Sequence, residues 1–132
     1  MKKFISILLL IALCVLMIGC GKSGSEKPSG MESLTEVEEY LKEKNVVSGE
    51  KTEVLAEMIG ATSGFKYLDS NVEVYEYDTK SDTYKNLEKT NTVELKDFGM
   101  TLTASAINGK YVLFCEDATN KDEIITIFKD MK

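Results

Sequence analysis

Few side chains in this sequence are suited to covalent chemistry. Cysteine occurs at positions 14, 20 and 115, histidine is absent, and every basic residue is lysine. Without histidine the chain can form no Ser-His-Asp triad, no Cys-His nucleophile pair and no histidine-rich zinc site. Carboxylates, Ser-Lys pairs and thiols are among the groups that remain for any catalysis.

Cys20 follows a segment with the layout of a secretory signal. Lys2 and Lys3 precede an apolar run from Phe4 to Ile18, which is followed by Gly19. Charge, apolar core and a small residue at a cut site are the three parts of such a signal. The run is short for a membrane-spanning helix, which needs about 20 apolar residues. The two lysines favour a cytoplasmic N-terminus, so the rest of the chain is expected to cross the membrane.

The residues at positions 16–20, Leu-Met-Ile-Gly-Cys, resemble the lipobox of bacterial lipoproteins. The resemblance implies cleavage between Gly19 and Cys20, a diacylglyceryl group on the Cys20 thiol, and further acylation such as palmitate. It places the domain on the outer face of the bacterial cytoplasmic membrane, with membrane lipid as a partner and no other cofactor. Met17 stands where the family prefers Leu, Val or Ala. An ordinary secretory signal and an uncleaved anchor are the alternatives.

The polar segment 20–30 after the leader predicts a flexible tether. It is rich in Gly and Ser, and ten such residues have a root-mean-square reach of roughly 17 Å. Residues 31–132 are then expected to form one small α+β domain with a modest core.

Charge argues against nucleic acid as a partner. The chain has 16 basic and 22 acidic residues, and two of the lysines lie in the leader. The part after the leader therefore carries a net charge of −8. Such a surface repels the phosphates of nucleic acids and of anionic lipids.

Hydrophobic periodicity predicts two N-terminal helices followed by two ββα units. Apolar spacing and turn residues give helices at 33–44, 50–59, 81–89 and 120–131, and strands at 65–68, 72–78, 100–107 and 110–115. Ser33 and Glu36 have capping-box spacing. The expected fold class is α+β, with a four-stranded antiparallel sheet and helices on one face. This element order resembles small, uncharacterised lipoproteins of low-GC Gram-positive bacteria, which implies no activity.

Residues Asn108 and Gly109 predict a two-residue hairpin turn that pairs Ile107 with Lys110. Counting outward, Cys115 then lies opposite Leu102 on the core side of the sheet. A thiol in an apolar site has a raised pKa and is unreactive. We therefore expect Cys115 to be structural.

The opposite face of the predicted sheet is the candidate binding surface. Tyr75 and Tyr77 share one face of their strand, and aromatic side chains are favoured at interfaces. The residues of this surface are Tyr75, Tyr77, Thr101, Thr103 and Phe114. Ordinary cross-strand packing is the competing interpretation of the same pattern.

Two further segments have a partial resemblance to ligand-binding motifs. Residues 60–64 are small but lack the Lys-Ser/Thr ending of a phosphate loop. A calcium loop starting at Asp117 would have Lys121 at its fifth position and no glycine at its sixth. Asn120 and Glu123 have capping-box spacing instead, so no metal site is expected.

These observations favour a non-enzymatic, lipid-anchored domain that binds a protein, peptide or envelope component. A small extracytoplasmic enzyme using carboxylates or a Ser-Lys pair is the rival hypothesis. An inhibitor or immunity-type lipoprotein is a third.

Overall fold

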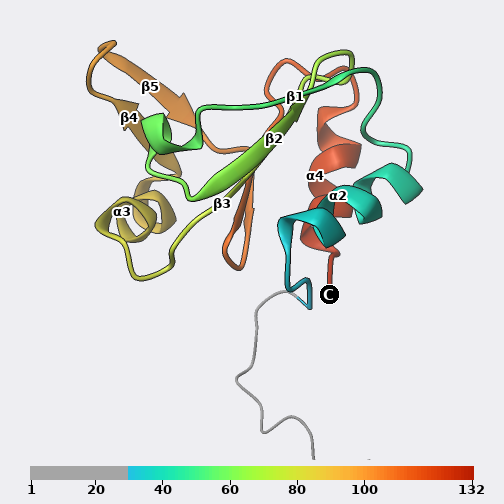
Figure 1. The fold of residues 1–132 in the computed structure, drawn as a ribbon, viewed down its shortest axis with the longest axis horizontal. Coiled ribbons are helices and arrows are strands. Elements are labelled where there is room, and N and C mark those ends of the chain that lie inside the picture. The colour runs from blue at the N-terminus through green and yellow to red at the C-terminus, as the bar shows by residue number, and fades with distance from the viewer. Residues whose placement is uncertain (1–29) are drawn as a thin grey trace, which may run out of the picture.

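The computed structural model describes residues 30–132 (Figure 1). The predicted leader, the cleavage site at Gly19 and Cys20, and all but the last residue of the tether lie outside this range. The elements in chain order are α2 (Leu34–Glu43), β1 (Lys51–Thr52), the 3-10 helix η1 (Ala56–Ile59), β2 (Ser63–Tyr67), β3 (Val72–Glu76), α3 (Asp82–Thr90), β4 (Thr92–Leu95), β5 (Met100–Thr103), β6 (Ala106–Asn108), β7 (Tyr111–Phe114) and α4 (Lys121–Lys129). None of the helices in this range combines the length and the apolar composition that a bilayer-spanning helix requires.

The strands form a five-stranded antiparallel sheet, here called the main sheet, and a separate two-stranded sheet. The order in the main sheet is β1-β2-β3-β7-β6, and β4 pairs only with β5. Helices α2 and α4 lie on one side of the main sheet, and η1, α3 and the β4–β5 hairpin lie on the other (Figure 1). The α+β class and the antiparallel pairing are confirmed. The four-stranded sheet covered on one face is wrong, because both faces are covered.

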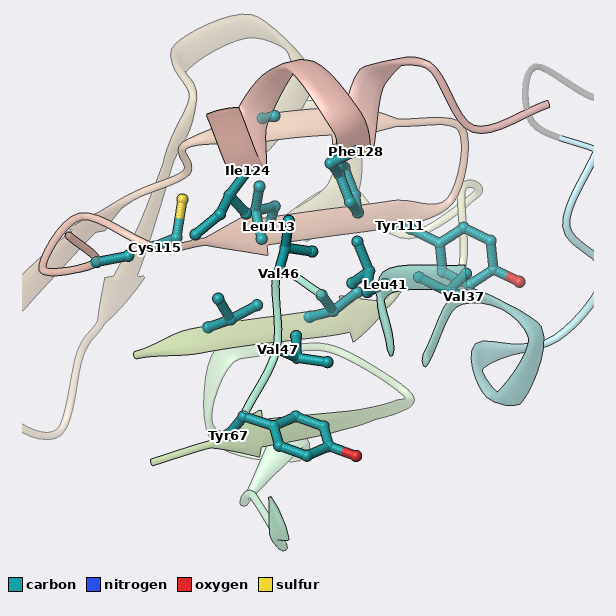
Figure 2. Close-up of a cluster of buried hydrophobic side chains, with 14 of the residues drawn as sticks. Val37, Leu41, Val46, Val47, Tyr67, Tyr111, Leu113, Cys115, Ile124 and Phe128 are labelled. Carbon is teal, nitrogen blue, oxygen red and sulfur yellow. The ribbon is translucent and has the colours of Figure 1, made fainter. Parts of the chain in front are cut away.

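Buried hydrophobic side chains form a cluster on each side of the main sheet. The first cluster is the core between the main sheet and helices α2 and α4 (Figure 2). Leu41 from α2 and Phe128 from α4 are fully buried against Leu113 of the sheet. Its other buried members are Val37, Val46, Val47, Phe65, Tyr67, Val72, Val74, Ala106, Tyr111, Cys115, Ala118, Ile124 and Met131. Helices of only nine or ten residues are marginal alone. The apolar stripe that each buries here is therefore what stabilises it.

The ends of the two helices are stabilised differently. At α2 the predicted capping box is confirmed: Ser33 Oγ accepts from the Glu36 N–H at 3.3 Å, and Glu36 Oε2 accepts from the Ser33 N–H at 3.4 Å. At α4 the predicted side-chain cap is wrong, because the side chain of Asn120 makes no capping hydrogen bond. Two acidic residues in the first turn, Asp122 and Glu123, instead favour the positive end of the helix dipole.

The predicted helix at 50–59 is wrong. Residues 51–52 pair with residues 66–67 as β1, and only the last turn winds, as η1. Two apolar side chains of this segment, Leu55 and Met58, are 76% and 43% exposed, so they form no buried helix face. Pairing with the edge of β2 satisfies main-chain groups that a short, isolated helix would leave at its ends. Gly60 ends η1, with a φ of 71°.

The predicted strand at 100–107 is two strands in different sheets. The chain leaves the β4–β5 hairpin at Ala104, whose N–H donates to the carbonyl of Asn91 at 2.7 Å. It joins the main sheet at Ser105, whose N–H donates to the carbonyl of Leu113 at 2.8 Å. The alternation of apolar residues continues through this corner, so the sequence pattern could not reveal it.

The predicted hairpin register is wrong by two residues. Asn108 pairs with Tyr111, so the turn consists of Gly109 and Lys110. Asn108 remains in the strand because its buried amide donates to the carbonyls of Phe128 at 2.9 Å and Met131 at 3.2 Å, at the end of α4. A two-residue shift preserves the face of every side chain. Cys115 therefore stays on the core side, although Leu102 is not its partner.

Candidate functional site

The tyrosines of the predicted binding surface are buried. Tyr75 and Tyr77 are only 7% and 2% exposed, and both belong to the second cluster, the core between the main sheet and η1, α3 and β4–β5. Burial raises the pKa of both phenols. The Tyr77 hydroxyl donates to the Ile59 carbonyl at 3.1 Å. The prediction that they face outward is wrong, because a second layer covers this part of the sheet.

A glycine explains how Tyr75 lies so close to the sheet. Gly64 is its cross-strand partner, and a Cβ at position 64 would lie 2.4 Å from the Tyr75 ring. The ring also contacts Phe114 edge to face, with centroids 5.7 Å apart. The Tyr75 hydroxyl donates to Glu73 Oε2 at 2.8 Å. Tyr75 is therefore a buried residue that packs against Phe114 and holds Glu73, and it is not itself part of an exposed surface.

The other three residues of the predicted surface, Thr101, Thr103 and Phe114, do come together. They line an open groove of about 510 Å³, a size in the range of small-ligand pockets. We call it the β5 groove, and its remaining lining residues are Lys66, Asn71, Glu73, Leu102, Glu116 and Asp117. It lies where the second layer leaves the end of the main sheet uncovered.

Pairing within the main sheet builds one wall of the β5 groove. Glu73 of β3 is opposite both Lys66 of β2 and Phe114 of β7, so the three side chains form a row across one face. The other wall is β5, in which Thr101 and Thr103 are exposed. The sequence predicted that Phe114, Thr101 and Thr103 share a face of one sheet, whereas β5 belongs to the two-stranded sheet and the three residues meet only across the groove.

The β5 groove carries more negative than positive charge. Lys66 Nζ lies 2.6 Å from Glu73 Oε1, so these two charges offset each other. Glu116 pairs with Lys121, which is outside the lining, at 2.8 Å. Within residues 30–132, no ion pair engages Asp117. The sequence offered a signal for Glu73 and Lys66, because their hairpin was predicted, whereas Asp117 stood out only as the first residue of a calcium loop that was not expected to bind metal.

A second polar cluster lies away from the groove, around Glu38 of α2. Glu38 is 7% exposed and accepts hydrogen bonds from Lys51 at 2.7 Å and from the Tyr67 hydroxyl. Lys42 Nζ lies 2.9 Å away. Burial alone would raise the pKa of Glu38, but the hydrogen bonds from Lys51, Tyr67 and Lys42 outweigh it and lower the pKa to about 2. An acidic residue on a helix is usually solvated, so the sequence alone does not reveal this buried cluster.

Cys115 is a core residue, as predicted. Its side chain is 1% exposed, and burial raises the pKa of its thiol. Its N–H donates to Ser105 Oγ at 3.0 Å, at the corner between the two sheets. In the described part of the chain, no group of three or more Cys, Asp and Glu side chains is arranged to hold a metal ion.

The β5 groove lies beside the N-terminal half of β3, and the described chain ends lie beside the C-terminal end of the same strand. Gly30 lies against Lys132, and Lys110 links Glu32 to Glu76 at the C-terminal end of β3. Glu73, which lines the groove, is three residues earlier on β3, or about 10 Å along the strand.

Comparison with known proteins does not assign this chain to a family. No protein-family model, curated protein or solved structure matches this chain. Its function must therefore be inferred from the chemistry of its own residues.

Proposed function

We propose that this chain is a lipid-anchored extracytoplasmic protein that uses the β5 groove to bind a protein, peptide or other envelope component. The observation that carries the proposal is the groove itself: an apolar ring, a row of charged groups and an exposed strand meet in one open depression. Binding sites commonly combine an apolar floor with a few polar groups that fix orientation. Phe114 supplies the floor here, and Glu73 and Asp117 supply polar groups.

The anchor half of the proposal is supported by the first twenty residues. A basic start, an apolar run and the lipobox-like segment ending at Cys20 all favour a lipid on that residue. Two or more acyl chains give stable attachment, at ~0.8 kcal/mol for each buried methylene. A domain tethered through Gly30 would be attached beside the C-terminal end of β3, whereas the β5 groove lies beside the N-terminal half of that strand.

The anchor is tested by replacing its sulfur. We expect Cys20→Ser to lose acyl labelling and to leave the membrane fraction or to remain uncleaved. Cys115→Ser is the matched control, because the Cys115 thiol is buried in the first cluster, and it should label like the parent. Normal labelling of Cys20→Ser would show that the anchor is elsewhere or absent.

The binding half is tested by photo-crosslinking on intact cells. A photoreactive residue at Thr103, in the groove, should give a discrete crosslinked product, and Asp117→Lys in the same chain should weaken it. The same residue at Lys85, exposed on α3 outside the groove, is the control. Equal products from both positions, or none from Thr103, would remove the groove as the binding site.

A further inference from the structure

The outer edge of β5 has main-chain groups that are free to pair. Val93 faces Leu102 and Glu94 faces Thr101 in the β4–β5 register. Because the Ala104 N–H bonds to Asn91, the alternation of an antiparallel ladder makes Leu102 the next residue bonded to the other strand. The N–H and C=O groups of Thr101 and Thr103 therefore point away from β4, toward the groove.

Within residues 30–132, no hydrogen bond joins the main chain of Thr101 or Thr103 to any residue outside the hairpin. Both residues are exposed, and Thr101, Leu102 and Thr103 all line the β5 groove. A strand placed in the groove would thus meet two unpaired donors and two unpaired acceptors.

The two end strands of the main sheet and strand β4 are protected. At one end of the main sheet, β1 has only two residues, and its Lys51 is paired with Glu38. At the other end, β6 contacts α4, and the side chain of its Asn108 is bonded to that helix. Strand β4 contacts α3 and η1. Proteins usually guard an open edge with charge, proline or a covering element.

The edge of β5 has none of these guards. Residues 100–105 contain no charged residue and no proline, and a groove lies alongside them where a covering element would be. The far wall of this groove belongs to the main sheet, which is not paired with β5, so the edge faces open space.

We propose that the ligand of the β5 groove is an extended polypeptide segment carrying Lys or Arg, which adds to the free edge of β5 as a third strand. This inference rests on the proposed function and names its ligand class. Strand addition is a common mode of peptide recognition, in which main-chain bonds give affinity and alternate side chains give specificity. Four residues of β5 match about 13 Å of an extended segment.

Charge decides between a basic segment and a second copy of this chain. Three of the four charged groups that line the groove are carboxylates: Glu73, Glu116 and Asp117. The chain is itself acidic, with a net charge of −6, so a second copy would meet repulsion there. A segment bearing lysine or arginine would pair with Asp117 and approach faster through electrostatic attraction.

The test begins with the full-length protein, purified in detergent, and a phage-displayed pool of random ten-residue peptides. We expect the selected peptides to be enriched in Lys and Arg. Asp117→Lys should lower the affinity of a synthetic selected peptide at least tenfold. Asp97→Lys, the same substitution on the β4–β5 hairpin outside the groove, should leave the affinity unchanged. Enrichment in acidic residues, or equal effects of both substitutions, would overturn the inference.

Methylation of peptide nitrogens tests the strand geometry. In an added strand, alternate amides face β5, so N-methylation of one alternate set should lower affinity at least tenfold and methylation of the other set far less. Equal effects of the two sets would overturn strand addition. That outcome is distinguishable from failure of the proposed function, because crosslinking at Thr103 on intact cells would still occur.

Discussion

One face of the main sheet is covered by two α-helices, and the other by a 3-10 helix, a short α-helix and a two-stranded sheet. The first cluster is closed, and polar groups at its rim are bonded within the protein, as the Asn108 and Glu38 contacts show. The second cluster buries Tyr75, Tyr77 and Val112, but its covering layer does not reach the end of the sheet.

This difference locates the surface to which we assign binding. The covering layer of the second cluster leaves Phe98 and Met100 60% and 55% exposed on the β4–β5 hairpin, beside the unpaired edge. A closed helical layer maximises burial, whereas a two-stranded layer necessarily brings open edges with it. We therefore assign stability chiefly to the first cluster and binding to the margin of the second.

The largest expected effect is the loss of a side chain from the first cluster. Phe128→Ala should lower the free energy of unfolding by about 4 kcal/mol, because a fully buried phenylalanine leaves a cavity. Phe98→Ala is the matched control on the hairpin, and it should change stability by less than about 0.5 kcal/mol. Urea denaturation measures both. Similar losses from the two variants would contradict the division between the clusters.

Acid should weaken the contact between α2 and the sheet through Glu38. Its pKa is lowered from 4.5 to about 2 in the folded protein. A lowered pKa means that the carboxylate stabilises the fold above pH 4.5, and that this stability is lost as pH falls toward 2. The full effect is about 3 kcal/mol.

Replacing the Glu38 carboxylate by an uncharged amide tests whether this residue causes the pH dependence of stability. Glu38→Gln should lower stability at pH 7 and flatten the fall in stability between pH 5 and pH 2, as measured by urea denaturation at a series of pH values. Glu39→Gln changes an exposed neighbour on the same helix and should leave the profile unaltered. Identical profiles for the parent and Glu38→Gln would show that another group is responsible.

Removing the amide of Asn108 should have a smaller effect. Asn108→Ala leaves main-chain carbonyls at the end of α4 without their donor, which costs about 2 kcal/mol for buried groups. Thermal unfolding should show the loss, whereas Asn86→Ala, on the exposed side of α3, should show none. If Asn108→Ala unfolded at the same temperature as the parent, water would be replacing the amide and the hairpin register would have another cause.

The smallest effect on stability, and a large one on binding, is expected at the edge of β5. Thr101→Lys places a charge on an exposed strand residue and should change the free energy of unfolding by less than about 0.5 kcal/mol. It should nevertheless lower the affinity for a selected basic peptide at least fivefold, because a lysine at position 101 repels the peptide and blocks pairing at the strand edge. Unweakened binding would place the peptide elsewhere.

The sequence predicted those features that depend on local patterns. The capping box at Ser33, the β2–β3 hairpin and helix α3 follow from residues close together in the chain. The buried position of Cys115 follows from alternation along a strand, which survives a register shift of two residues.

The features that were missed depend on contacts distant in sequence. Asparagine is a residue type typical of turns, but the side-chain amide of Asn108 is hydrogen-bonded to α4, which comes much later in the chain. The corner at Ala104 and Ser105 divides a strand whose alternation is continuous. Tyr75 and Tyr77 were expected to be exposed because the sequence gives no sign that η1, α3 and β4 cover that face. The groove is what this cover leaves open.

Amide hydrogen exchange at Thr101, Leu102 and Thr103 tests the free edge most directly. In the protein alone, Leu102 should exchange slowly and the two threonines fast, because only Leu102 bonds to β4. A bound peptide selected on the groove should slow exchange at Thr101 and Thr103 and leave Leu102 unchanged. Slow exchange at all three amides without peptide, or no change at the threonines with it, would contradict strand addition at β5.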